Sequence, residues 1–294
     1  MPFRKIAIVG VGLLGGSIGL AAQRRRLAGE VAGYVRREAS LRDCERAGAV
    51  DYATTDLLAA VSGANLVILC TPLAQMASLV ERMLPALGRG AIVTDVGSAK
   101  TRVVKELEPL IRRTGAHFVG SHPMAGSERT GVLVARADLF ENAACVVTPT
   151  NRTRPDALKK VERFWRDLGA RVIRLRPEQH DLLVGRSSHL PHVTAAMLAR
   201  VVLDPAHPKE QALLCANGFR DTTRIASGSP EMWRDIALAN GRNLDRALGA
   251  LIRELQRFQR ALRKGDGKAI SSLLEQARQR RDAWCSAGAS PSPE

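Results

Sequence analysis

Two short segments of this chain carry side chains that could move a proton or hold an anion. His122 lies in Gly120–Glu128, a polar segment behind an apolar run, where an imidazole could accept a proton near neutral pH. Arg224 lies in Gly218–Ala226, where a guanidinium could hold a carboxylate through two hydrogen bonds. Each residue also has an ordinary explanation, since His122 could cap a loop and Arg224 could pair with Asp221 at the surface.

A second group of histidines occurs in Ser187–His192. His189 and His192 are three positions apart, so they share one face if this segment is helical. Metal binding is disfavoured, because no cysteine or carboxylate stands where it would complete a ligand set. We therefore predict no metal site here.

A glycine-rich turn follows the first apolar run of the chain. The run Ile6–Val9 leads into residues 10–15, GVGLLG, which reads as a strand, a tight turn and the start of a helix. Gly10 would permit the turn, Gly12 would let phosphate approach the backbone, and Gly15 would let the helix pack close to its strand. The helix N-terminus would attract the pyrophosphate of a dinucleotide. The alternative is a glycine turn that binds nothing.

Apolar runs alternate with amphipathic stretches in the first half of the chain, which predicts a parallel sheet with crossover helices. Thr71 and Pro72 directly follow one of these runs, at the edge that faces the ligand in doubly wound folds. The expected strands are Lys5–Val9, Val31–Tyr34, Leu66–Cys70, Ala91–Thr94, His117–Gly120, Ala144–Thr148 and Arg171–Arg174, and the expected helices include Leu14–Ala28, Ala74–Leu84, Lys100–Arg113 and Pro155–Leu168.

From about Pro177 the strand-like runs disappear and helical periodicity takes over, notably in Leu244–Leu262 and Ala269–Ala283. We expect an α/β fold with an N-terminal Rossmann-type domain at residues 1–176, built on a doubly wound, mostly parallel sheet. An all-α domain at residues 177–285 would supply the substrate pocket and the dimer contact. Residues 286–294, rich in Ser, Pro and Ala, are predicted to be a disordered tail.

The composition narrows the possible partners. The formal net charge is +15, but the arginines are spread over many segments and only 4% of residues are aromatic, so platforms for base stacking are scarce. We expect no nucleic-acid partner and a surface that attracts anionic small molecules.

Five scattered cysteines suit a reducing compartment. No apolar stretch reaches the roughly 20 residues needed to cross a bilayer, and the N-terminal apolar run is too short for a signal peptide. A cytoplasmic location without membrane contact follows.

The end of the second expected strand bears on the choice of cofactor. NAD-binding sites often place an acidic residue there to bind the adenosine ribose, and Val35 occupies that position in this chain. Arg36 and Arg37 follow, and guanidinium groups suit a 2′-phosphate. We therefore predict NADP, with NAD as the alternative. The two arginines could instead simply begin the next helix in solvent.

These segments occur in an order that resembles the prephenate dehydrogenase family, which includes the cyclohexadienyl dehydrogenases of tyrosine biosynthesis. The resemblance covers nearly the whole chain and is carried by the glycine turn together with Asp95–Lys100, Ser121–Glu128, Ser188–His192, Gly218–Arg224 and Trp233. It implies a dinucleotide-binding domain joined to a helical domain that forms a homodimer. It also implies oxidation of prephenate to 4-hydroxyphenylpyruvate by NAD(P) with loss of CO₂.

The same resemblance implies roles for single residues. His122 would be the base at the substrate hydroxyl, and Ser98 would orient that hydroxyl and the nicotinamide. Arg224 would bind the ring carboxylate, while His189 would hold two helices together. The remaining implied substrate-site residues are His192, Ser127, Glu128, Asp221 and Trp233, and the implied cofactor contacts are Gly10, Gly12, Leu13, Leu14, Gly15, Arg36, Arg37, Thr71 and Pro72.

Other activities remain open at this point. The chain could instead be an arogenate dehydrogenase, which gives tyrosine, or a dual-specificity cyclohexadienyl dehydrogenase. Prephenate and arogenate differ only at the side chain of the substrate. A β-hydroxyacid dehydrogenase or a pyrroline-carboxylate reductase would share the general build, but the segment Ser121–Glu128 argues against both. A non-catalytic NADP sensor or a nucleic-acid-binding protein would leave His122 and Arg224 without a role.

Overall fold

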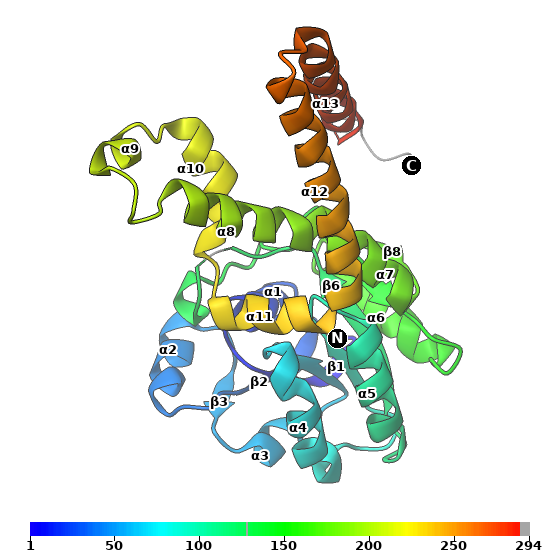
Figure 1. Ribbon diagram of the computed structural model, residues 1–294. Coiled ribbons are helices and arrows are strands. Elements are labelled where there is room, and N and C mark those ends of the chain that lie inside the picture. The colour runs from blue at the N-terminus through cyan, green and yellow to red at the C-terminus, as the bar shows by residue number, and fades with distance from the viewer. Residues whose placement is uncertain (128, 289–294) are drawn as a thin grey trace. The chain divides into compact units, whose positions relative to one another are not determined.

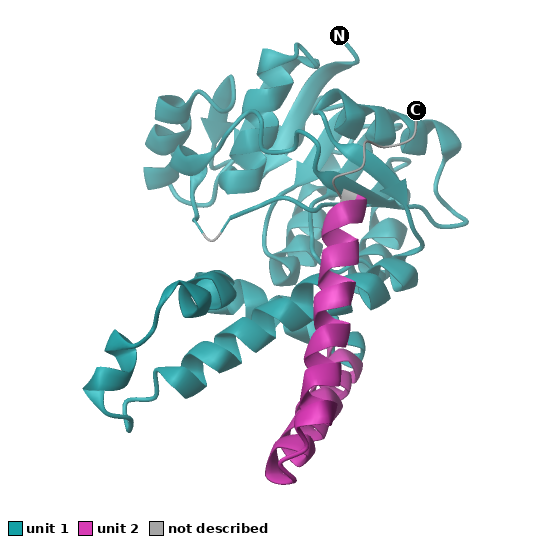
Figure 2. Cartoon of the chain, turned by 90° about the horizontal axis from the view of Figure 1, so that it is seen from above, with its two compact units in different colours: residues 1–243 teal, residues 244–294 magenta. Residues whose placement is uncertain are grey.

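The computed structural model describes residues 1–127 and 129–288 (Figure 1). The chain forms two compact units, residues 1–243 and residues 244–294 (Figure 2). The first unit holds the sheet and the helices up to Ala239, so the domain boundary at 176/177 stays a prediction. Glu128 and residues 289–294 of the predicted tail lie outside the described residues.

Eight strands form one sheet in the order β3-β2-β1-β4-β5-β6-β7-β8. Every neighbouring pair is parallel except β6 and β7, which confirms the doubly wound, mostly parallel fold. Strand order reverses between β1 and β4, and in such sheets the crevice at that point receives the ligand. The strands are β1 (Phe3–Val9), β2 (Ala28–Tyr34), β3 (Tyr52–Thr54), β4 (Leu66–Leu69), β5 (Ile92–Asp95), β6 (His117–Pro123), β7 (Ala144–Thr148) and β8 (Arg171–Arg174).

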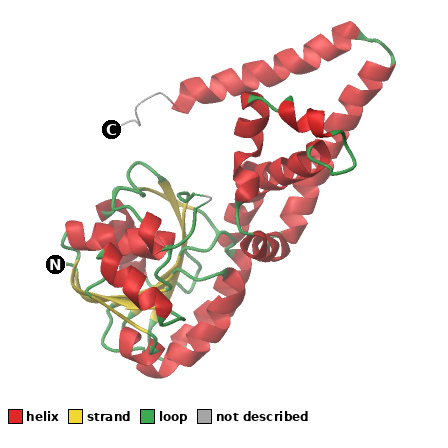
Figure 3. Ribbon diagram, turned by 90° about the vertical axis from the view of Figure 1, so that its left-hand side faces the viewer, coloured by secondary structure: helices red, strands yellow, loops and turns green. Residues whose placement is uncertain are grey.

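Helices cover both faces of this sheet (Figure 3), because each face carries apolar side chains that must leave water. One buried cluster includes Ile8, Ile18 and Trp165, and the other includes Val67, Met76 and Leu107. The helices of this region are α1 (Leu13–Arg24), α2 (Ala39–Ala47), α3 (Leu57–Val61), α4 (Leu73–Met83), η1 (Leu84–Ala86), α5 (Thr101–Arg112), η2 (Val132–Val134) and α6 (Pro155–Asp167).

Three details of the sequence-based prediction were wrong. The first helix ends at Arg24 rather than Ala28, because Arg26 takes a left-handed conformation (φ 53°) and Ala28 already begins β2. The short elements β3, α2 and α3 were not predicted. Strand β6 continues through Pro123, so Ser121 and His122 lie on a strand rather than in a loop.

Helices alone follow β8 in the part of the chain that the structure describes, as predicted. They are α7 (Pro177–Val184), a π-helical turn η3 (Gly185–His189), α8 (Leu190–Val202), α9 (Lys209–Leu213), α10 (Asn217–Thr223), η4 (Arg224–Ser227), α11 (Pro230–Ala239), α12 (Gly241–Arg263) and α13 (Gly267–Gly288). The last helix extends three residues into the predicted tail, and no helix within the described ranges is long and apolar enough to cross a membrane.

Candidate active site

The glycine turn between β1 and α1 has the geometry that its sequence predicts. Gly10 adopts a φ of 100°, which side chains rarely tolerate, and a Cβ there would lie 2.8 Å from the carbonyl oxygen of Cys70. A Cβ on Gly15 would lie 2.1 Å from the carbonyl oxygen of Gly10. A Cβ on Gly12 would meet no atom within 4 Å. The turn is therefore tightly packed at Gly10 and Gly15 and open at Gly12.

The open side of this turn suits the pyrophosphate of a dinucleotide. Helix α1 begins at Leu13 behind Gly12, and no side chain among the described residues caps it, so the first N–H groups are available to an anion. Thr71 packs against Gly10, and Pro72 stands at the start of α4. The carboxyl ends of β1 and β4 thus bring the predicted cofactor residues together.

The predicted ribose-side residues lie beside the same turn. The backbone N–H of Gly10 donates a hydrogen bond to the carbonyl oxygen of Tyr34, the last residue of β2, at 2.9 Å. Val35 is buried, while Arg36 and Arg37 are exposed ahead of α2. An apolar side chain and two guanidiniums therefore replace the acidic group at this end of β2.

His122 begins a chain of buried polar groups. It is 7% exposed, and its Nδ1 atom lies 2.8 Å from Nε2 of His180 in α7. Nδ1 of His180 lies 2.8 Å from Oδ1 of Asp181. Sequence reasoning missed both of these residues, although an adjacent His-Asp pair in the first helix after the sheet was a usable signal. The three side chains connect the middle of the sheet to the helical part of the first unit.

The Asp181 carboxylate receives hydrogen bonds from the beginning of α5. The backbone N–H of Lys100 donates to Oδ1 at 2.7 Å, and that of Thr101 donates to Oδ2 at 2.9 Å. Burial raises the pKa of the Asp181 carboxyl, but hydrogen bonds from His180, Thr101 and Lys100 outweigh it and hold that pKa below its usual value. Asp181 is therefore an anion that caps the N-terminus of α5.

A second buried anion fixes the segment that carries Ser98. Asp95 and Lys100 form an ion pair, and neither side chain is exposed. Asp95 also accepts hydrogen bonds from the backbone N–H groups of Gly97 at 2.8 Å and Ser121 at 3.2 Å. The Lys100 ammonium donates to the carbonyl oxygen of Ser121 at 2.8 Å. The loop from Asp95 to Lys100 is thereby fastened to the strand that presents His122.

The electrostatic environment keeps His122 neutral. Burial lowers the pKa of the His122 imidazole well below its usual value, and the neighbouring His180 and Lys100 lower it further. Burial likewise lowers the pKa of His189 to about 4. A neutral imidazole at residue 122 has a lone pair with which to accept a proton.

Trp233 of α11 contacts two histidines, His189 at the end of η3 and His192 on α8. The ring of His192 stacks on Trp233, with centroids 3.5 Å apart and planes at 8°. His189 meets the same indole edge to face, with centroids 6.1 Å apart, and its Nδ1 lies 3.2 Å from Nδ2 of Asn240. His189 and His192 therefore do face the same way, and His189 joins η3 to the end of α11.

The remaining predicted substrate residues lie on more exposed segments. Arg224 begins η4, and Gly228 just beyond η4 packs against Trp233 and His192. Asp221 on α10 is exposed, as is Ser127, whose Oγ accepts a hydrogen bond from the N–H of Arg129 at 2.9 Å. The structure thus brings η4 to the His192–Trp233 stack, whereas no hydrogen bond among the described residues joins Ser127 to the stack.

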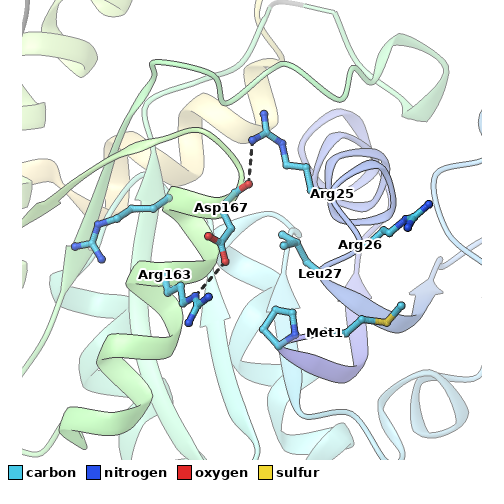
Figure 4. Close-up of a pocket in the computed structure, with 8 residues that line it drawn as sticks. Met1, Arg25, Arg26, Leu27, Arg163 and Asp167 are labelled. Atoms are coloured by element: carbon cyan, nitrogen blue, oxygen red, sulfur yellow. Dashed lines mark hydrogen bonds and ion pairs between the residues drawn. The ribbon is translucent and has the colours of Figure 1, made fainter.

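A separate cavity of about 490 Å³ lies at the opposite edge of the sheet, beside the start of β1 (Figure 4). Arg25 donates to the carbonyl oxygen of Asp167 at 3.1 Å and pairs with Glu141, while Arg163 pairs with the Asp167 carboxylate at 3.6 Å. None of the predicted site residues lines this cavity. Within the described ranges, no group of three or more potential ligands is placed to hold a metal ion.

Comparison with known proteins identifies the family. Residues 18–174 match the model of the prephenate dehydrogenase nucleotide-binding domain, and residues 176–276 match that of its dimerization domain. The chain is 33% identical to the cyclohexadienyl dehydrogenase of Zymomonas mobilis, over 95% of both chains. It is 32% identical to the prephenate dehydrogenase of Bacillus subtilis, over 94% of this chain and 75% of that one.

Solved structures agree with these sequence matches. The prephenate dehydrogenase of Aquifex aeolicus, in complex with hydroxyphenyl propionate and NAD⁺, superposes with a TM-score of 0.86 at 32% identity, covering 95% of this chain and 98% of that one. The Synechocystis arogenate dehydrogenase gives a TM-score of 0.78 at 31% identity, covering 95% and 99%. Matched in both of its parts and along nearly its full length, this chain belongs to the prephenate dehydrogenase family.

Proposed function

We propose that this protein is a prephenate dehydrogenase that converts prephenate and NADP⁺ to 4-hydroxyphenylpyruvate, CO₂ and NADPH. The observation that carries the proposal is the buried His122 on β6, at the carboxyl-end side of a sheet whose glycine turn fits a dinucleotide. Membership of the family indicates which reaction is catalysed. The site provides His122 as the base and the glycine turn as the place where the cofactor would bind.

The chemistry requires three tasks of the protein. The carbinol carbon of the substrate loses a hydride while its hydroxyl loses a proton, and the ring carboxylate then leaves as CO₂ so that the ring becomes aromatic. The bound nicotinamide supplies the hydride acceptor. The protein must therefore take the hydroxyl proton, hold the ring carboxylate and align the reacting carbon.

His122 would take the proton from the hydroxyl and return it to the phenolate oxygen once the ring is aromatic. Ser98 would orient the same hydroxyl, because its loop is fastened to the strand of His122 through Asp95 and Lys100. Arg224 would bind the ring carboxylate through a charge-assisted hydrogen bond. His192, held on Trp233, would contact the substrate directly.

Three further residues are assigned to the proposed pocket. Ser127 and Glu128 lie a few residues past His122 in the chain. We assign Ser127 to substrate contact, and Glu128 either to gating of the site or to support of the residues that contact the substrate. Asp221 would support Arg224 from the preceding helix. The proposed domains are a cofactor domain at residues 1–176 and a helical domain at residues 177–285. Residues 176–276 match a dimerization domain, which supports a homodimer formed through the helical domain. A cytoplasmic location belongs to the same proposal.

The NADP preference rests on the end of β2. Val35 removes the acid that would repel a 2′-phosphate, and the exposed Arg36 and Arg37 add positive charge beside Gly10. NAD is the second candidate, and the Aquifex aeolicus relative was solved with NAD⁺. For the substrate the second candidate is arogenate, and the observation behind it is the similarity to the Synechocystis arogenate dehydrogenase.

A stoichiometric assay tests this proposal. The purified protein is incubated with prephenate and NADP⁺, and reduced nicotinamide, CO₂ and 4-hydroxyphenylpyruvate are quantified. Equal amounts of all three are expected. Nicotinamide reduction without CO₂ release would contradict oxidative decarboxylation.

A further inference from the structure

The three buried groups His122, His180 and Asp181 form a chain in which the position of each proton depends on its neighbour. His180 is fully buried and Asp181 is 2% exposed. The ring nitrogens of His180 are both engaged, with Asp181 Oδ1 at 2.8 Å on one side and His122 Nδ1 at 2.8 Å on the other. A neutral imidazole has one N–H and one lone pair. If one ring nitrogen donates a hydrogen bond, the other can therefore only accept one.

The charge of Asp181 decides which ring nitrogens of His180 and His122 carry protons. Its carboxylate is ionised and receives the N–H groups of Lys100 and Thr101, so it can only accept a hydrogen bond from His180. Nδ1 of His180 must then carry the proton, and Nε2 of His180 carries the lone pair. Nδ1 of His122 must therefore donate to that lone pair. The remaining nitrogen of His122, Nε2, is left without a proton.

Nε2 of His122 is also the ring nitrogen that remains available. No hydrogen bond from a residue in the ranges 1–127 and 129–288 reaches it, and it is not among the polar atoms sealed from solvent. The helix that carries His180 is held from a further side, because Nδ2 of Asn240 donates to the carbonyl oxygen of Asp181 at 2.7 Å. The Asp181 end of the chain of hydrogen bonds is thus fixed to the fold.

We propose that His180 and Asp181 are positioning residues that fix His122 in the tautomer with a proton on Nδ1, leaving the Nε2 lone pair for the substrate hydroxyl. The two residues also hold the ring orientation, and the Asp181 charge stabilises the imidazolium that forms when His122 takes a proton. In serine proteases an aspartate bonded directly to the catalytic histidine has a comparable role, whereas here His180 stands between Asp181 and His122. The inference rests on the proposed function for the identity of the reaction but not for the proton positions.

Nitrogen NMR of the full-length protein, labelled with ¹⁵N-histidine and free of substrate, tests the proton positions directly. The two ring nitrogens of each neutral tautomer have distinct shifts, and His122→Asn identifies the signals of residue 122. We expect the Nδ1–H form of His122. A wild-type spectrum with the proton on Nε2 of His122 would overturn the proposal, whatever the activity of the protein.

Two substitutions of His180 separate positioning from mere packing. His180→Leu fills the space but removes the acceptor, so we expect a mixed tautomer at His122 and a kcat lower by about 10²-fold, with the KM for prephenate and the affinity for NADP unchanged. His180→Gln offers a carbonyl oxygen near the former Nε2, and we expect it to restore the Nδ1–H form and most of the lost kcat. Asp181→Asn, which removes the charge, should lower kcat without raising KM.

His117→Gln is the matched control, because it changes a histidine at the far end of the same strand, β6. We expect wild-type kcat and an unchanged His122 spectrum from it. Equal kcat values for folded His180→Leu and wild type would overturn the positioning role, as would a His180→Gln variant no better than His180→Leu. If the protein oxidises neither prephenate nor arogenate, the proposed function fails, and the spectrum still decides the tautomer.

Discussion

The carbonyl oxygen of Gly10 lies only 2.1 Å from the place where a Cβ of Gly15 would stand. The first turn of α1 is therefore packed on the glycine turn with no room for a methyl group. Gly12, between them, faces open space instead. The two outer glycines thus serve the fold, whereas the middle one leaves room for a ligand.

This difference predicts opposite phenotypes for two alanine substitutions. Gly15→Ala should lower the free energy of unfolding by about 1–3 kcal/mol, because the backbone must move to admit the methyl group. Gly12→Ala should leave stability nearly unchanged and weaken cofactor binding by about tenfold, because the methyl group occupies the open side of the turn. Thermal unfolding and nucleotide titration of both variants measure these effects. Normal cofactor affinity in Gly12→Ala would argue against the pyrophosphate site.

The pH dependence of activity should reflect the environment of His122. Burial first, and then His180, Lys100 and His189, lower the pKa of this imidazole. The neutral form is the active base, so kcat/KM should stay high as the pH falls through 6.5, the ordinary histidine value. The acidic limb should appear only below that pH. A pH–rate profile of kcat/KM measures it, and a limb at or above 6.5 would contradict the assignment of His122 as a buried, neutral base.

Arg224 should act mainly on substrate binding. Arg224→Ala removes a charge-assisted contact of about 2–5 kcal/mol, so the KM for prephenate should rise by at least about tenfold, with a smaller change in kcat. Arg220→Ala, one helical turn earlier, serves as the control and should leave KM near the wild-type value. If the two variants behave in the reverse way, the ring carboxylate binds Arg220 instead.

Cofactor choice should depend on the end of β2. Replacing Arg36 and Arg37 together by Ala should raise the KM for NADP while leaving that for NAD nearly unchanged, because only NADP carries the 2′-phosphate. Val35→Asp should shift the preference further toward NAD by repelling that phosphate. Initial rates with both cofactors measure the ratio. Equal loss with NADP and NAD in the double alanine variant would mean that the arginines do not contact the phosphate.

Much of the fold could be predicted from local sequence signals. Ala144–Thr148 and Arg171–Arg174 have the predicted bounds, because each has adjacent β-branched residues at its centre and lies between turn signals. The end of α1 escaped prediction because Arg26, not glycine, adopts the left-handed conformation there. Strand β3 has three residues, too few to show a period.

The site was harder to predict than the sheet. Residues Ser121–Pro123 look like a polar loop in sequence, and only pairing with β7 makes them a strand, with His122 opposite Val146. His180 and Asp181 gain their importance from contacts with His122 and the start of α5, which lie far away in sequence. The adjacent His-Asp pair is visible in the sequence, but only the fold decides which groups it contacts, so sequence reasoning found the base and not the groups that orient it.

We expect this protein to oxidise and decarboxylate prephenate with His122 as the base. Initial rates of nicotinamide reduction, with prephenate or arogenate crossed with NADP or NAD, test it most directly, with His122→Asn assayed in parallel. We expect the highest kcat/KM for prephenate with NADP and a loss of about 10²–10⁴-fold in kcat for His122→Asn at unchanged cofactor affinity. No reduction in any of the four combinations, or full turnover by the His122→Asn variant, would contradict the account.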